Sequence, residues 1–184
     1  MPTNRRIVLA SRPKGVATTS NFRLEEVPVP TLQPGQFLVR NHWLSLDPYM
    51  RGRMNDGRSY VDPQPLDQVM LGGTAGEVIE SRNPGFAVGS KVVGYLGWQE
   101  HAVSDGTGVF KVDTRHVPLS AYLGSVGMPG VTAWYGLNRV IDPRDGQTIV
   151  VSAASGAVGS VVGQLARIRG LRAIGFAGGA EKCR

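Results

Sequence analysis

The sequence is poor in the residues that build disulfides and metal sites. Its 184 residues contain one cysteine, Cys183, and three histidines. One cysteine excludes an intramolecular disulfide and any zinc site built from several cysteines. The sequence also lacks an apolar N-terminal segment typical of a secretion signal and any run of 18 or more apolar residues. We therefore predict a cytoplasmic protein that does not enter a membrane.

The positive charge of the chain is scattered. A net charge of +6 arises from 20 Lys and Arg against 14 Asp and Glu. Nucleic-acid binding requires a basic stripe with stacking aromatic residues, and the sequence shows no such stripe. The one local group of cations, Arg51, Arg53 and Arg58, is interpreted as a solvated face. We expect no nucleic-acid partner.

Residues 148–163 predict a strand, a turn and a helix. A β-branched run gives way to small residues, and hydrophobic residues then recur at helical spacing. Ala154, Gly156 and Gly159 have the spacing of a G-x-G-x-x-G turn. Small residues there permit a tight turn, close approach of backbone N–H groups to a pyrophosphate, and close packing of helix and strand. We predict a dinucleotide-binding βα unit, with an ordinary strand-to-helix turn as the alternative.

The residues that follow favour NADP(H). Residues 171–177 predict a second buried strand, after a helix stop at Gly170. Beyond it, Lys182 and Arg184 provide positive charge for the 2′-phosphate of NADP, whereas an acidic residue would bind the ribose of NAD. Glu181 lies a few positions too late to be that acid. The alternative is that both cations are solvated at a frayed end.

The first 112 residues predict an all-β module. Its short apolar runs, separated by turns, are residues 6–10, 22–27, 36–46, 74–81, 91–95, 99–103 and 109–112. Residues 47–68 have no clear period and form the longest expected loop. From residue 118 the sequence predicts two helical stretches, interrupted at Met128, Pro129 and Gly130.

Five motifs in order carry a family resemblance. They are residues 46–53 (LDPYMRGR), 94–99 (GYLGWQ), 127–133 (GMPGVTA), 154–164 (ASGAVGSVVGQ) and 177–184 (AGGAEKCR). With them the chain resembles the N-terminal part of the zinc-free medium-chain dehydrogenase/reductase superfamily, in the branch of prostaglandin reductases, leukotriene B4 12-hydroxydehydrogenases and bacterial curcumin reductases. The resemblance implies a GroES-like catalytic domain over residues 1–117. It also implies hinge helices and the first βαβ unit of an incomplete Rossmann domain over residues 118–184.

The resemblance assigns a cofactor site. Gly156, Ala157, Val158 and Gly159 match the family's pyrophosphate turn, and Lys182 matches its 2′-phosphate lysine. The cofactor implied is NADPH/NADP.

Three further residues match positions at the reacting groups. Met128 and Thr132 match the segment that flanks the nicotinamide, and Tyr49 matches a tyrosine that borders the substrate pocket. Each has a structural alternative. Met128 would fill a gap in a core, Thr132 would bond within its own helix, and Tyr49 would be a half-buried aromatic residue.

The activity that the resemblance implies is reduction of a carbon–carbon double bond conjugated to a carbonyl, with NADPH as hydride donor. Quinone reduction and a non-catalytic NADP-binding sensor or structural relative are the alternatives. Charge that develops on the carbonyl oxygen requires hydrogen-bond donors, for which Tyr49, Tyr60 and Asn41 are candidates.

No catalytic metal is expected. Where zinc-dependent relatives place their ligands, this sequence has Leu46-Asp47 and Gly72-Gly73-Thr74. The histidines are too isolated to form a site: His42 and His101 are expected in strands and His116 in a loop.

A doubly wound domain needs about five or six parallel strands, and this sequence predicts two. Two such strands leave apolar sheet surface uncovered. We therefore expect a truncated chain that is inactive by itself, from a reductase of small enones or quinones that forms homodimers at full length. The uncovered edges would allow an edge-paired or domain-swapped oligomer.

Overall fold

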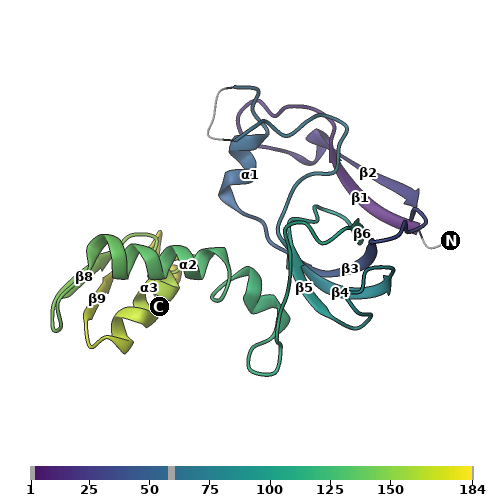
Figure 1. The fold of residues 1–184 in the computed structure, drawn as a ribbon. Coiled ribbons are helices and arrows are strands. Elements are labelled where there is room, and N and C mark those ends of the chain that lie inside the picture. The colour runs from purple at the N-terminus through teal and green to yellow at the C-terminus, as the bar shows by residue number, and fades with distance from the viewer. Residues whose placement is uncertain (1–2, 58–60, 184) are drawn as a thin grey trace. The chain divides into compact units, whose positions relative to one another are not determined.

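The structure, a computed structural model, describes residues 3–57 and 61–183. It divides into two compact units, Met1–Leu119 and Ser120–Arg184, referred to below as the β-domain and the C-terminal unit (Figure 1). Three residues given roles by the sequence, Arg58, Tyr60 and Arg184, lie outside the described residues.

Seven strands lie in the described part of the β-domain. They are β1 (Thr3–Leu9), β2 (Phe22–Pro28), β3 (Phe37–Leu44), β4 (Thr74–Ser81), β5 (Lys91–Gly94), β6 (His101–Ser104) and β7 (Val109–Lys111). Each overlaps one of the seven predicted runs, so the predicted strands are confirmed, although the module is β-rich rather than all-β because it also contains helices. A short 3₁₀ helix, η1 (Thr19–Asn21), precedes β2, and a second, η2 (Leu119–Leu123), spans the boundary between the two units in the chain.

The strands form an antiparallel sheet and a separate hairpin. The sheet has the order β6-β3-β4-β5-β7, and the hairpin pairs β1 with β2. Single bridges from Arg6 to Gln99 and from Val8 to Val69 connect β1 to the rest of the domain. Side chains alternate along each strand, and one face of the sheet carries the core residues Phe37, Val39, Val78, Val92 and Val109.

A second core lies between the hairpin and a short helix. Helix α1 (Pro48–Arg53) places Met50 inside, and Met54 follows directly after it. Both methionines pack with Leu9 and Met70. The prediction of a loop over residues 47–68 is therefore wrong at its start. One helical turn is too short to show a period, and Pro48 suits the first position of a helix.

Arg51 and Arg53 of α1 are half-buried, so the interpretation as a solvated face is wrong for these two arginines. Arg51 donates from Nε to the Gly15 carbonyl at 3.1 Å and from Nη1 to Asn55 Oδ1 at 2.7 Å. Arg53 Nε is buried. The Gly15 carbonyl belongs to a distant loop, and a sequence pattern does not reveal such a partner.

The C-terminal unit contains α2 (Met128–Tyr135), a π-helical turn η3 (Gly136–Ile141), β8 (Thr148–Val151), α3 (Gly159–Ile168), β9 (Arg172–Gly175) and a 3₁₀ turn η4 (Ala180–Cys183). The predicted helix interruption at Met128–Gly130 is wrong, because α2 begins at Met128. Proline is tolerated in a first helical turn, where its missing N–H would lack a partner in any case.

Strands β8 and β9 are parallel, with α3 between them in the chain. The helix ends at Ile168, and Gly170 shortly after it has a φ of +68°, the left-handed conformation that glycine adopts at low cost. This βαβ unit and its helix stop confirm the predicted order of elements. Its core consists of Leu137, Ile149, Ala166 and Leu171.

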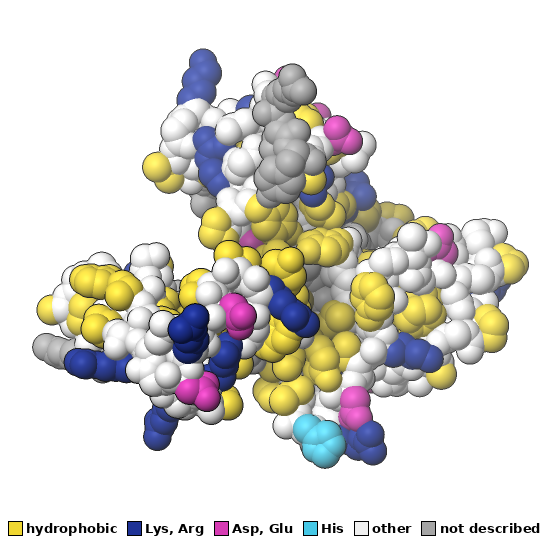
Figure 2. Space-filling model, turned by 60° about the vertical axis from the view of Figure 1, so that its left-hand side comes forward, with side chains coloured by type: hydrophobic (Ala, Val, Ile, Leu, Met, Phe, Trp, Pro, Cys, Tyr) yellow, Lys and Arg dark blue, Asp and Glu magenta, His cyan; other side chains and the backbone are white. Residues whose placement is uncertain are grey.

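The second strand of this unit is not buried, which corrects the prediction. All four residues of β9 are exposed, and Ile174 keeps 40% of its surface. On β8, Ile149 is buried against Ala166, whereas Val150 on the opposite face is 65% exposed. Hydrophobic side chains appear in yellow on the face drawn in Figure 2. Only one face of the two-stranded sheet is covered among the described residues.

Candidate functional site

The turn between β8 and α3 brings the predicted pyrophosphate residues together. Ala153 adopts a φ of +48°, which is uncommon for a residue with a side chain. The Ala154 N–H donates to the Phe176 carbonyl at 2.9 Å, so the turn is joined to the residue after β9. The Gly156 N–H donates to the Ala153 carbonyl at 2.8 Å. These bonds fold the chain back sharply before the helix begins.

Gly159 cannot be replaced without moving the turn. It is buried at the first position of α3, and a Cβ there would lie 2.4 Å from the Ala153 carbonyl oxygen. A Cβ at Gly156 would lie 3.0 Å from the same oxygen. Gly163, in the middle of the helix, has open space around it. The two glycines of the turn thus serve close packing, and the third does not.

The start of α3 presents unused hydrogen-bond donors. Among the described residues, the backbone N–H groups of Ala157, Val158 and Gly159 donate to no backbone carbonyl, whereas Ser160 N–H donates to the Gly156 carbonyl at 2.9 Å. No side chain caps the helix, which begins after Val158. Free N–H groups and the positive end of the helix dipole suit an anion such as a pyrophosphate. The residues present therefore fit a dinucleotide.

Lys182 lies beyond β9 in the turn η4 and is exposed. Its neighbour Cys183 donates from Sγ to the Ala177 carbonyl at 3.7 Å. The assignment of Lys182 to a 2′-phosphate stays a prediction.

Met128 and Thr132 lie one turn apart at the start of α2. The Thr132 hydroxyl donates to the Met128 carbonyl at 2.8 Å, which is the bond within the helix that the sequence offered as its alternative role. Met128 is 45% exposed and therefore does not fill a gap in the core of its unit. Their roles beside a nicotinamide stay predictions.

Tyr49 lies in the first turn of α1, and its ring packs against the cluster formed by Leu9, Met50, Met54 and Met70. The half-buried position suits the alternative and the pocket role equally. Asn41, another candidate donor, already uses Nδ2 to donate to the Gln99 carbonyl at 2.9 Å. Their contribution to catalysis stays a prediction.

Residues 5–112 match a family described as the N-terminal domain of oxidoreductase. The chain belongs to this family. The matched residues include β2 to β7 in full and all of β1 except its first two residues.

The relatives confirm the zinc-free reductase branch that the motifs indicated. The NADPH-dependent curcumin reductase of Escherichia coli is 50% identical over 98% of this chain and 52% of the relative. Prostaglandin reductase 1 of Rattus norvegicus is 42% identical over 92% of this chain and 50% of the relative. The chain therefore spans about half the length of each of these two relatives.

A crystal structure supports the fold assignment. CurA from Vibrio vulnificus, solved in complex with NADPH, is 49% identical and superposes with a TM-score of 0.91 over 97% of this chain and 53% of that chain. The β-rich N-terminal domain predicted as GroES-like is thereby confirmed. That the βαβ unit is the start of a Rossmann domain stays a prediction.

Within residues 3–57 and 61–183, no three His, Cys, Asp or Glu side chains gather where they could hold a metal ion. No helix there is long and apolar enough to cross a membrane. His42 and His101 lie in strands and His116 in a bend, as predicted.

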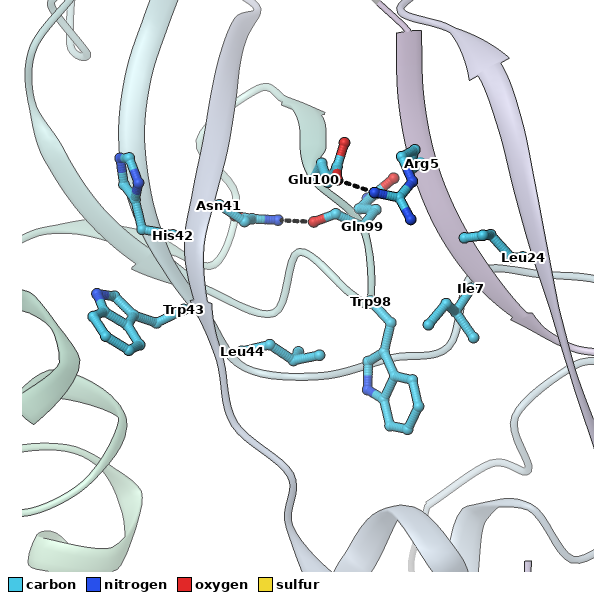
Figure 3. Close-up of a pocket in the computed structure, with 10 residues that line it drawn as sticks. All are labelled: Arg5, Ile7, Leu24, Asn41, His42, Trp43, Leu44, Trp98, Gln99 and Glu100. Carbon is cyan, nitrogen blue, oxygen red and sulfur yellow. Dashed lines mark hydrogen bonds and ion pairs between the residues drawn. The ribbon is translucent and has the colours of Figure 1, made fainter. Parts of the chain in front are cut away.

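The β-domain has a hollow that was not predicted from the sequence. It measures about 250 Å³ and lies between β1 and the end of β3, with Trp98 on its wall (Figure 3). Trp98 belongs to the motif at residues 94–99, but no functional role was predicted for it. Gly72 lies directly against this side chain, because a Cβ there would be 2.8 Å from Trp98 Nε1. A glycine next to a large aromatic side chain marks a close contact that only the fold identifies.

Proposed function

We propose that this chain is the N-terminal half of an NADPH-dependent reductase of carbon–carbon double bonds conjugated to a carbonyl. The observation that carries the proposal is the β8-turn-α3 segment, with its crowded Gly159 and its unused N–H groups at residues 157–159. The NADPH-dependent curcumin reductase and prostaglandin reductase 1, which match over nearly the whole chain, support it.

Within this proposal the residues of the C-terminal unit bind the cofactor. The N–H groups of Ala157, Val158 and Gly159 would donate to the pyrophosphate, and Lys182 would pair with the 2′-phosphate. When bound, NADPH supplies a hydride. Met128 and Thr132 would lie beside the nicotinamide, as the resemblance implies. The first βαβ unit of a Rossmann domain is the fold that this arrangement requires.

In the β-domain, Tyr49 would border the substrate. Hydride addition to a conjugated double bond leaves negative charge on the carbonyl oxygen, and a hydroxyl donor stabilises that charge. The ring packs against a methionine-rich cluster, which limits its rotation and so fixes its hydroxyl. The substrate class is a small enone; small-molecule substrates and a homodimer are proposed for the longer protein.

The first test is a fluorescence titration of the chain with NADPH and NADH. We expect tighter binding of NADPH, and a loss of about tenfold in NADPH affinity for Lys182→Ala, which corresponds to one charge-assisted hydrogen bond of about 1.4 kcal/mol. NADH affinity should not change in the variant.

Lys14→Ala, at an exposed lysine of the β-domain, is the matched control and should bind both nucleotides like the parent chain. Equal affinity for NADH and NADPH would contradict the NADP assignment. Absence of binding of either nucleotide would contradict the role given to residues 156–159. Oxidation of NADPH by the longer protein, with an enone and a quinone in parallel, separates a reductase from a sensor.

A further inference from the structure

Gly175, the last residue of β9, lies against the turn that precedes α3. It pairs with Val151 at the end of β8. A Cβ placed on Gly175 would lie 2.7 Å from the Cβ of Ala154, and no other described heavy atom beyond its chain neighbours is within 4 Å of that position. Carbon atoms in contact stay about 3.5–4.0 Å apart. The missing side chain of Gly175 therefore makes room for Ala154 alone.

The backbone conformation does not account for this glycine. The φ of Gly175 lies outside the left-handed region, so its backbone is open to a residue with a side chain. Gly179, four positions later, has the opposite requirement, with a φ of +88° and open space around it. Gly175 thus serves a close approach between β9 and the turn.

Two hydrogen bonds join the turn to the strand end beside this contact. The Ala154 N–H donates to the Phe176 carbonyl, and the Phe176 N–H donates to the Val151 carbonyl, both at 2.9 Å. Ala153, just before Ala154, already has a φ of +48°. The turn therefore has little freedom to absorb a shift at Ala154, and a displacement there moves residues 157–159 with it.

The same strand end leads into the segment that carries Lys182. The turn η4 follows β9 after a short connection, and Cys183 Sγ donates back to the Ala177 carbonyl at 3.7 Å. Lys182 is therefore placed relative to β9, whereas residues 157–159 are placed relative to the turn. The contact between Gly175 and Ala154 connects the two.

We propose that Gly175 is a positioning residue that determines the preference for NADPH over NADH. Its contact with Ala154 sets the spacing between Lys182 and the N–H groups of residues 157–159. This role rests on the proposed function. The 2′-phosphate and the pyrophosphate belong to one adenosine, so NADPH requires one spacing of the groups that bind them. NADH has no 2′-phosphate, and its binding does not depend on that spacing.

A side chain at Gly175 would change this spacing. The turn must move about 1 Å away from β9, because a separation of 2.7 Å must become an ordinary contact of about 3.5–4.0 Å. Such a displacement takes a hydrogen bond out of its range of about 2.7–3.2 Å. NADH follows the turn when it moves, whereas NADPH must give up contacts to one of its two phosphate groups.

Fluorescence titrations of Gly175→Ala with NADPH and NADH test this role. We expect the NADPH affinity to fall about tenfold and the NADH affinity about threefold or less, so that the preference for NADPH narrows by at least about threefold. Gly136→Ala, in the same unit and with open space around its Cβ position, is the matched control and should bind both nucleotides like the parent chain. Circular dichroism gives the temperatures at which each variant is folded, and the titrations are made there.

Exchanging the side chains of the two partners should restore the preference. Ala154→Gly combined with Gly175→Ala removes the one atom in the way, and Ala154 Cα lies more than 4 Å from the new Cβ. We expect this double variant to prefer NADPH within about twofold of the parent chain. Ala154→Val enlarges the other side of the contact and should narrow the preference as Gly175→Ala does, which keeps the test open if Gly175→Ala fails to fold. Instability alone would lower both affinities by the same factor.

Lys182 provides an independent check. Lys182→Ala should cost about tenfold in NADPH affinity in the parent chain, but about threefold or less in the Gly175→Ala chain, where the lysine no longer reaches the 2′-phosphate.

In a parent chain that prefers NADPH, three results would overturn the role of Gly175 alone. They are an unchanged preference in Gly175→Ala, a double variant that does not regain the preference, and an equal cost of Lys182→Ala in both backgrounds. Equal affinity of the parent chain for NADPH and NADH, or binding of neither, would overturn the proposed function and this role with it. The two failures are distinguishable, because the second is seen before Gly175 is changed.

Discussion

The β-domain and the C-terminal unit bury their hydrophobic residues to very different degrees. In the β-domain, Phe37, Val39 and Val78 are completely buried on one face of an antiparallel sheet. In the C-terminal unit, Val150 and Phe176 keep 65% and 62% of their surface. An antiparallel sheet needs a cover on one face, whereas a parallel sheet needs it on both. Among the described residues, the sheet of the first unit therefore has the cover that it needs, whereas the sheet of the second unit does not.

The largest effect is expected where the β-domain is best packed. Phe37→Ala removes a completely buried ring whose centroid lies 4.2 Å from that of Phe86, and should lower the free energy of unfolding by about 3–5 kcal/mol. Hydrogen exchange should show that strands β3 and β4 lose protection, while the C-terminal unit does not. Phe110→Ala, at a residue 67% exposed, is the control and should cost less than about 1 kcal/mol. A similar loss of stability for both variants would show that the buried ring of Phe37 contributes no more to folding than the exposed ring of Phe110.

The next effect is expected at the turn before α3. Gly159→Ala forces a Cβ against the Ala153 carbonyl and should cost about 1–3 kcal/mol in the stability of the C-terminal unit, with weaker NADPH binding. The matched control is Gly163→Ala in the same helix, which has open space and should stabilise the helix by about 0.5–1 kcal/mol. Thermal unfolding and a nucleotide titration measure both. Stabilisation by both substitutions would show that helix propensity, not crowding at Gly159, decides.

The uncovered strands supply a third test. If the exposed face or edge of β8 and β9 pairs between copies of the chain, Val150→Lys should weaken self-association about tenfold or more, because a valine would otherwise be buried in the contact. Sedimentation at several concentrations measures this. Val16→Lys, at a residue 86% exposed in the β-domain, should leave self-association unchanged. A chain that is monomeric at all concentrations would contradict the expected oligomer.

The smallest effect is electrostatic and belongs to the β-domain sheet. Lys91 Nζ lies 2.8 Å from Glu77 Oε2, and this contact, followed by His42 at 3.6 Å, lowers the pKa of the Glu77 carboxyl. A lowered pKa means that the ionised form is favoured by folding. Its stabilisation is therefore present above the ordinary pKa of glutamate and is lost as the pH falls through the lowered value.

Urea unfolding of Glu77→Gln checks the sign. The variant should be less stable by up to about 1 kcal/mol near neutral pH, and the difference should vanish in acid. Glu80→Gln, at an exposed position of the same strand, should show no such dependence on pH. A difference that grows in acid would mean that Glu77 is held in its protonated form.

Elements with strong local signals were predictable from the sequence. Each of the seven β-domain strands follows an apolar run between turn residues, and Gly170 marked the end of α3 correctly. Helix α1 was missed because a single turn shows no period, and its burial depends on Leu9 and Met70 from distant parts of the chain. The exposed β9 was taken as buried, since its sequence reflects a cover that the described residues do not provide.

The candidate site likewise has features that were predictable from the sequence and features that depend on tertiary contacts. The sequence alone determined the β8-turn-α3 segment, because small residues at fixed spacing leave few other turns available to the backbone. Only the tertiary structure revealed that Arg51 binds a loop carbonyl and that Asn41 and Trp98, 57 positions apart by their numbers, line one hollow. Contacts between distant segments depend on how strands pair and on which side chains then meet. Local patterns determine elements, and packing between elements determines which of their polar groups are left to bind something else.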